Sequence, residues 1–370
     1  MISIGILTVP DSARKFKGNH DNFVEIVKAA RKRGVSVYVI TTRDLHLRHP
    51  RILAYEYDVK ENRWKERWIP IPPVIYNRIP SREHEQRPEV RQVIEECLRS
   101  PHTRLYNPYF FNKWHLIQWL SSSRATRRHI PETRKYSSSL PLLPLLKRHP
   151  VLYLKPEQGK AGMGIMRIRR TGGLQPSYIL TIQQKRSSES RRFSSLAAMR
   201  QHLNAMIGGE DYIVQQGVSL ATLNDSPFDL RVLVQKNGKG QWALTGIGAR
   251  VAGESSITTH VPRGGSIDKP KKLLRQYFGP VRTKTILAKA GRTSVSIARQ
   301  IEQSSGHMLG EMSMDMGVDR KGKLWFFEAN SRPMKFDEPK IRRKSLQRLI
   351  DYCIYLHRKS KPRPRTVHYV

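Results

Sequence analysis

Apolar residues in the first hundred positions alternate between strand-like and helix-like spacing. Residues 2–9 form an apolar run typical of a buried strand, and apolar residues at helical spacing follow in 22–33, before Gly34. A second strand-like run occupies 35–40. This strand–helix–strand order predicts an α/β domain that opens on a pair of parallel strands. A hairpin over 55–68, a strand within 72–80 and a helix over 87–98 complete a first domain of residues 1–105.

The pattern continues through the rest of the chain. Asn112 is a natural N-cap for a helix that starts beside it. The basic, Ser-rich stretch 185–195 is typical of a solvated linker or surface loop. The other predicted elements are strands over 151–156 and 212–218, a hairpin of strands 228–235 and 242–251, and helices over 197–207, 271–278, 285–303 and 339–357. The last of these helices carries a stripe of Leu346, Leu349, Ile350 and Cys353.

The pattern of residues 310–333 predicts a β-hairpin that carries the candidate metal-binding side chains. With the turn at Asp319-Arg320-Lys321-Gly322, Val318 faces Lys323 and Asp315 faces Phe326. Because side chains alternate along a strand, one face is almost wholly apolar. It carries Met312, Met314, Met316, Val318, Trp325, Phe327 and Ala329.

The opposite face of this hairpin projects Asp315, Glu328 and Asn330 from one side. Magnesium usually takes one or two carboxylates and leaves its other positions to water and phosphate oxygens, so these hard oxygen ligands suit it. The alternative is an ordinary half-exposed hairpin with a solvated acidic side.

A second informative stretch places Gly159, Gly162 and Gly164 between two strand-like runs. Glycines let backbone N–H groups close over phosphates without interference from side chains. Lys160 is not followed by Ser or Thr and no helix begins here, so this is not a Walker A loop. The order strand, glycines, strand suits a flap that covers a nucleotide. The alternative is a Gly-rich hairpin without a ligand.

The net charge of the chain is its most unusual overall property. The chain of 370 residues has 67 Lys and Arg against 30 Asp and Glu, a formal net charge of +37. Such a field attracts nucleic acid, anionic polymers or acidic proteins without selecting among them. Cys97 and Cys353 are the only cysteines, which argues against a disulfide framework or a Cys-based zinc site.

The start is unlike a secretory signal and no apolar run approaches a membrane span, so we expect a cytoplasmic protein when made, with no membrane partner.

Together these stretches resemble the ATP-grasp superfamily, and most closely its YheC/YheD-like group of endospore coat-associated proteins. The motifs that carry the resemblance are YNRIP at 76–80, YNPYFFNKW at 106–114, KPEQGKAGMGI at 155–165, YIVQQGV at 212–218, FDLRVLVQ at 228–235, GEMSMDMGVD at 310–319 and FFEANSRP at 326–333. The resemblance implies an ATP-grasp fold with an N-terminal α/β pre-ATP-grasp domain. Its implied parts are 1–105, a small lobe with the glycine-rich flap at 106–213, a large lobe with the magnesium hairpin at 214–358, and a basic tail at 359–370.

The resemblance also implies ATP and Mg²⁺ as cofactors and assigns roles by position. Lys113 and Lys155 correspond to the phosphate-contacting lysines, and Gly159, Gly162 and Gly164 to the glycines of the flap. Gln215, Gln216 and Val218 correspond to the adenine-binding hinge. Arg231 and Arg250 correspond to cations that stabilise the transferring phosphoryl group, and Asp315, Glu328 and Asn330 to the magnesium ligands. Related peptide-ligating enzymes often carry an Asn before a Gly-Gly pair, where this chain has His260 with Gly264-Gly265. Asp225 is the candidate partner for the ribose hydroxyls.

The resemblance implies an ATP- and Mg-dependent ligase that activates a carboxylate as an acylphosphate for attack by an amine or another nucleophile. The carboxylate and the acceptor are unidentified, and the basic surface suits an acidic protein or polymer as acceptor. Spore coat proteins are candidate partners, and the endospore coat is a candidate location. One alternative is a non-catalytic ATP-binding component of the endospore coat. A nucleic-acid-binding protein ranks last, because no recognisable DNA- or RNA-binding module accompanies the charge.

Overall fold

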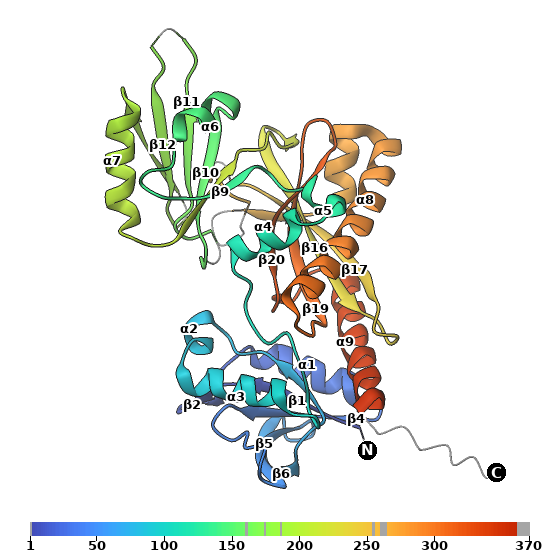
Figure 1. The fold of residues 1–370 in the computed structure, drawn as a ribbon. Coiled ribbons are helices and arrows are strands. Elements are labelled where there is room, and N and C mark those ends of the chain that lie inside the picture. Colours follow the sequence, from blue (N-terminus) through green and yellow to red (C-terminus); the bar gives the residue numbers. More distant parts are fainter. Residues whose placement is uncertain are drawn as a thin grey trace, which may run out of the picture.

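The computed structural model describes residues 2–159, 162–173, 175–185, 187–253, 256–259 and 265–360. Its first sheet lies at the blue end of the chain in Figure 1, with strand order β6-β5-β4-β1-β7-β8. The strands are β1 (Ile2–Thr8), β4 (Val35–Thr41), β5 (Arg51–Asp58), β6 (Arg63–Pro70), β7 (Val74–Asn77) and β8 (Arg104–Tyr106). β4, β1, β7 and β8 are parallel, and β5 and β6 form an antiparallel hairpin at one edge. The predicted α/β opening is confirmed.

Helices cover this sheet, and one of them comes from the far end of the chain. The local helices are α1 (His20–Arg31), α2 (Arg82–Glu85) and α3 (Pro88–Arg99), and β2 (Pro10–Asp11) pairs with β3 (Lys15–Phe16). The side chain of Asn19 caps α1 by accepting from the N–H of Asn22. The C-terminal helix α9 (Pro339–Ser360) buries its predicted apolar stripe in the same core, where Leu349, Ile350 and Cys353 pack with β1 and α1 residues. In Figure 1 the red helix α9 runs down beside this domain.

The second sheet has the strand order β13-β12-β11-β10-β14-β9. Its strands are β9 (Thr133–Lys135), β10 (Val151–Pro156), β11 (Met166–Arg170), β12 (Tyr178–Gln183), β13 (Ser188–Phe193) and β14 (Tyr212–Gln216), and α6 (Leu142–Arg148) and α7 (Leu196–Ile207) pack against it. The prediction of a surface loop over 185–195 is wrong for β13. This segment pairs antiparallel with β12, and the hydroxyls of Thr181 and Ser190 hydrogen-bond across the two strands.

The third sheet has the strand order β18-β17-β16-β19-β20. Its strands are β16 (Ser226–Lys236), β17 (Trp242–Val251), β18 (Ser266–Asp268), β19 (Glu311–Val318) and β20 (Leu324–Asn330), with β15 (Thr222–Leu223) paired to β16. The helix α8 (Pro270–Ser305) packs on it together with α4 (Lys113–Ser121) and α5 (Arg124–Arg127). Gly279 has non-helical φ and ψ and precedes Pro280, so α8 is kinked into the two helices that were predicted separately. No helix in the described ranges is long and apolar enough to cross a membrane.

The lobe boundaries remain a prediction. The helix α4 contributes Leu116 and Leu120 to the core of the third sheet, while β9 joins the second sheet.

The register of the β19–β20 hairpin differs from the prediction. Val318 lies opposite Leu324 and Asp315 opposite Glu328, with a register shift between Asp315 and Met316. Asp319 and Lys323 close a loop one residue longer than expected, and the Asp319 carboxylate accepts from the N–H groups of Lys321 and Lys323.

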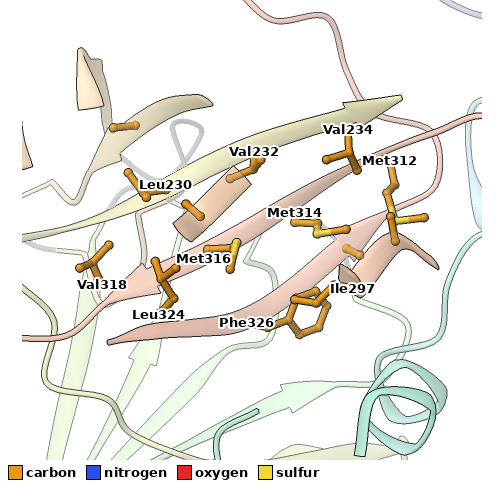
Figure 2. Close-up of a cluster of buried hydrophobic side chains, with 14 of the residues drawn as sticks. Leu230, Val232, Val234, Ile297, Met312, Met314, Met316, Val318, Leu324 and Phe326 are labelled. Carbon is orange, nitrogen blue, oxygen red and sulfur yellow. The ribbon is translucent and has the colours of Figure 1, made fainter. Parts of the chain in front are cut away.

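The longer loop exchanges the faces of four residues. Leu324 and Phe326 lie in the core with the methionines of β19, as Figure 2 shows, although the prediction put them on the polar face. Trp325 and Phe327 are not in that core, which is where they were expected. The shift restores the predicted side for Glu328, since it lies opposite Asp315.

Candidate active site between two sheets

A cavity lies between the second and third sheets, on the side of the second sheet away from α6 and α7. The space among its walls is about 910 Å³ when counted out to open solvent. Its walls are Tyr153, Lys155, Ile165, Gln215, Gln216, Val218, Leu220, Pro227, Asp229, Ile257, Thr258, Thr259, Asp315, Phe327 and Glu328. The predicted cofactor-binding residues among them are Lys155, Gln215, Gln216 and Val218, and the predicted metal ligands are Asp315 and Glu328.

Charged side chains form a row across the third sheet. The register places Arg231 opposite Asp315, and Asp315 opposite Glu328. Asp229 lies one step further along the same face of β16 and pairs with Arg250 of β17. Because alternate residues of a strand share a face, the pairing of four strands brings both arginines and the carboxylates to the cavity side of the sheet.

Arg250 holds two buried carboxylates together. Its Nε and Nη2 donate to Asp229 at 3.1 and 2.9 Å, and its Nη2 lies 2.7 Å from Asp315. Side-chain exposure is 6% for Arg250, 5% for Asp229 and 7% for Asp315. Burial opposes the charge of the guanidinium, yet the two carboxylates raise the pKa of Arg250 above its ordinary value. The Thr259 hydroxyl also donates to Asp229.

The two predicted phosphate lysines approach the cavity from different elements. Lys155 is the second-last residue of β10. Its Nζ donates to Oε1 of Gln215 at 2.6 Å and lies 5.4 Å from the centre of the Phe327 ring. Burial lowers the pKa of Lys155 to about 8, with the carboxylate of Glu328 opposing this change and the charge of Lys113 adding to it.

Lys113 starts α4, which Asn112 caps by accepting from the N–H of His115, as predicted. The Nζ of Lys113 donates to the carbonyl of Gly159 at 2.8 Å and lies 3.7 Å from Glu328. The two ammonium groups therefore reach the neighbourhood of one carboxylate from different elements.

The glycine-rich segment joins β10 to β11, which is the strand–glycines–strand order expected for a flap. Gly162 and Gly164 have φ of +72° and +68°, a region that favours glycine. A Cβ on Gly164 would lie 2.8 Å from the hydroxyl of Tyr212, so packing also demands glycine there. A Cβ on Gly159 would lie 3.0 Å from Pro156.

The predicted hinge, Gln215 to Val218, begins in the last two residues of β14 and continues past its end. The N–H groups of Gln216 and Gly217 donate to the carbonyls of Glu132 and Val151, each at 2.8 Å. These two amides therefore hold the segment against its neighbours. The Gln215 side chain points to the cavity, where it contacts Lys155. Val218 lines the cavity beyond them, so recognition of a base by this segment remains a prediction centred on Val218.

The carboxylates of the hairpin have the donor chemistry of a magnesium site. In the described part of the chain no three His, Cys, Asp or Glu side chains group as cation ligands. The available donors are Asp315 and Glu328, directly opposite each other, and Asn330, which lies opposite Ser313 at the next position on that face. A pair of carboxylates with an amide oxygen fits an ion that keeps water and phosphate oxygens as its other ligands.

Other predicted residues lie further away. The Arg231 guanidinium lies 5.1 Å from the centre of the Phe336 ring, and Arg231 does not line the described part of the cavity. Asp225 occupies the exposed turn between β15 and β16 with φ of +63°, and it is likewise outside the described cavity wall. His260 and Gly264 lie outside the described residues.

The structure adds cavity residues that the sequence analysis did not single out. Tyr153 lies two positions before Lys155 on β10, so the period of two would have found it. Phe327 was assigned to the core because of the register error, and its ring lies against Gly317, where a Cβ would come within 2.5 Å of it. Ile257 and Thr259 come from a loop that carries no sequence signal.

Comparison with known proteins gives the class of this chain. The pattern of the YheC/D like ATP-grasp family matches residues 102–356, and the chain belongs to this family. It is 28% identical to the endospore coat-associated protein YheD of Bacillus subtilis over 96% of this chain and 78% of that protein. It is 20% identical to YheC of the same organism over 90% and 89% of the two chains.

Solved structures with the same fold include ligases. The D-alanine–D-alanine ligase from Bacillus anthracis superimposes with a TM-score of 0.54 at 11% identity, covering 97% of this chain and 98% of that one. The ATP-grasp ligase PsnB, complexed with a minimal precursor, gives a TM-score of 0.53 at 14% identity and covers 96% and 99%. These likenesses confirm the predicted ATP-grasp fold.

Proposed function

We propose that this protein is an ATP- and magnesium-dependent ligase that joins a carboxylate to an amine or another nucleophile. Lys155, Asp315 and Glu328 line one cavity, while Lys113 lies 3.7 Å from Glu328 and Arg250 2.7 Å from Asp315, both outside the described wall. This cluster of charges carries the proposal. Phosphoryl transfer asks mainly for positioning and for cations around developing charge, and the cavity offers both. The name of the relatives, endospore coat-associated, supports a place in spore formation.

In this proposal the nucleotide lies between the two sheets. The base occupies the end of the cavity at Val218 and Tyr153, and the phosphates extend toward Lys155 and Lys113 under the glycine segment. Asp315, Glu328 and Asn330 would hold magnesium, which supplies positive charge to the phosphate oxygens when bound. Arg250 is held by Asp229 in a fixed orientation beside Asp315.

The reaction then proceeds in two displacements. An oxygen of the substrate carboxylate attacks the γ-phosphorus of ATP, and ADP leaves as the bond to the β-phosphate oxygen breaks. The nucleophile attacks the acyl carbon of the acylphosphate, inorganic phosphate leaves, and the proton of the nucleophile passes to solvent. Lys155 and Arg250 stabilise the negative charge that builds on the transferring group.

A trapping experiment tests this proposal. Purified protein is incubated with ATP, magnesium and candidate amino acids or acidic polymers in the presence of hydroxylamine, which converts an acylphosphate into a stable hydroxamate. We expect ADP and hydroxamate in equal amounts with the correct carboxylate. Tight ATP binding with neither product across the whole screen would favour a non-catalytic ATP-binding component of the endospore coat.

A further inference from the structure

A second cavity lies between the first domain and the segment that follows β20. Its space is about 1610 Å³ out to open solvent, and its described walls share no residue with the cavity between the sheets. We call it the basal cavity and define it by Arg14, Lys17, Arg78, His84, Arg332 and Lys335 among its walls. Asp11 is the one carboxylate among the described wall residues.

Two arginines form a fixed floor for the basal cavity, Arg332, which is buried, and Arg78, which is partly buried. Arg332 donates to the carbonyls of Ile79 and Pro108 at 3.0 and 2.7 Å and pairs with Glu85 at 2.5 Å. Arg78 donates to the carbonyl of Pro333 at 3.1 Å and lies 3.6 Å from Glu311. These partners account for the two floor charges, so the floor is a rigid, polar surface that joins the first domain to the third sheet.

The walls carry cations that are available to a ligand. Lys17 donates to Nε2 of His84 at 3.2 Å, which uses one of the three donors of its ammonium group. Within the described residues neither Arg14 nor Lys17 forms an ion pair with a carboxylate. The wall carboxylate, Asp11, accepts from the N–H groups of Arg14 and Ala13, which lowers its pKa.

The other wall adds charge and apolar contact. Lys335 lies 3.4 Å from Glu25, an exposed pair of the kind that contributes little, and Met334 is 71% exposed at the mouth. The first turn of α1 also faces this space, since Asn19, His20 and Asn22 line it. The positive end of the helix dipole therefore adds to the wall cations.

The basal cavity adjoins the candidate active site. The ring of Phe110 contacts two guanidinium groups, with Arg332 of the floor 4.2 Å from its centre and Arg82 5.2 Å away. Burial lowers the pKa of Arg82, and the charges of Glu85 and of Glu328 in the active site oppose that change. Arg332 itself follows the predicted metal ligand Asn330 by two residues. One bound chain of several residues would therefore reach from the basal cavity toward the phosphate end of the active site.

We propose that the basal cavity binds an acidic peptide, a segment with several neighbouring carboxylates, as the substrate of the ligase. This inference rests on the proposed function, in which a carboxylate is activated at the neighbouring site. Cations from two segments line this space, Arg14 and Lys17 before α1 and Lys335 after β20, so one carboxylate would leave most of them without a partner. A row of carboxylates matches them.

The test measures binding of fluorescein-labelled hexaglutamate by anisotropy, with hexaglutamine as the neutral peptide. The double variant Arg14→Glu, Lys17→Glu reverses two wall charges. The control Lys271→Glu, Arg275→Glu reverses two exposed charges of α8, in another cluster of basic residues. The double variant Arg14→Gln, Lys17→Gln, which removes the two charges without reversing them, keeps the test valid if the charge-reversed variant fails to fold. For every protein the ATP-induced rise in melting temperature is recorded as a measure of ATP binding.

We expect the wall variant to weaken hexaglutamate binding by about tenfold or more, the neutral pair by less, and the control by less than about twofold, because charge contacts in the cavity are local. Equal losses in wall and control variants would refute the inference in favour of a diffuse polyanion surface. Tighter binding of polyphosphate than of hexaglutamate to the same wall would refute a carboxylate occupant. Wild-type protein that binds ATP but not hexaglutamate refutes the inference alone, whereas absence of ATP binding refutes the proposed function.

Discussion

Replacing Lys155 by methionine is expected to stabilise the ligand-free protein while it abolishes ATP binding. Burial lowers the pKa of Lys155 from 10.5 to about 8, so the folded protein carries an unfavourable charge at neutral pH. A pKa difference of one between the folded and unfolded states corresponds to about 1.4 kcal/mol, which sets an upper limit of about 3.5 kcal/mol for the gain. Solvent screening of this half-buried side chain and the lost contact with Gln215 reduce the expected net gain to about 1–2 kcal/mol.

The pH dependence of that gain has a defined sign. In the unfolded chain Lys155 keeps its proton up to about pH 10.5, whereas in the folded protein it loses the proton near pH 8. Between these values the unfolded state binds more protons, so wild-type stability rises with pH. The advantage of Lys155→Met is therefore full below about pH 8 and shrinks toward about pH 10.5.

Urea denaturation of both proteins at about pH 7 and about pH 9.5 measures this difference. Lys28→Met, at an exposed position of α1, is the matched control and should show no such pH dependence. Calorimetric titration with ATP at about pH 9 in two buffers of different ionisation enthalpy should also reveal proton uptake, because phosphates favour the charged lysine. A Met variant less stable than wild type at neutral pH, or ATP binding without proton uptake, would refute the assignment of Lys155 to a desolvated phosphate site.

Three further outcomes are expected. Arg250→Ala should lower the free energy of unfolding in urea by about 3–5 kcal/mol, because it leaves two buried carboxylates without their cation. The same substitution should reduce turnover more than ATP affinity, and equal reductions would remove Arg250 from transition-state stabilisation. Glu328→Gln should weaken the magnesium-dependent part of the ATP-induced rise in melting temperature, and an unchanged magnesium titration would take Glu328 out of the metal site. Deleting 361–370 should leave ATP binding unchanged and weaken polyanion binding modestly, whereas deleting 345–370 should abolish the cooperative thermal transition because it removes core residues of the first domain; a normal transition in the longer deletion would contradict that packing.

Local patterns in the sequence predicted most elements. The first strand, helix and strand, the cap at Asn112 and the strand–glycines–strand segment all depend on neighbours within a few positions, and each is present. The strand at 188–193 was missed because its residues are mostly polar on both faces, so no alternation marks it. It is held by pairing with β12, which local sequence does not encode.

Non-local geometry accounts for the errors in the predicted site. A loop one residue longer than expected moved Phe327 out of the core and toward the cavity. The compensating shift kept Glu328 on the predicted face, where it lies opposite Asp315 in place of the predicted Phe326. The contact of Arg250 with two carboxylates needs β17, β16 and β19 to be adjacent in that order, which no spacing along the chain reveals.

The packing of α9 into the first domain has a consequence for how the chain is made. The core of that domain includes Leu349, Tyr352 and Leu356, although its own strands end at Tyr106. At synthesis rates of about 5–20 residues per second, roughly 12–50 s pass between the emergence of β8 and that of α9. During this interval the nascent first domain exposes the apolar surface that α9 later covers. Its completion is therefore a late step that waits for α9, and until then the first domain needs protection from aggregation.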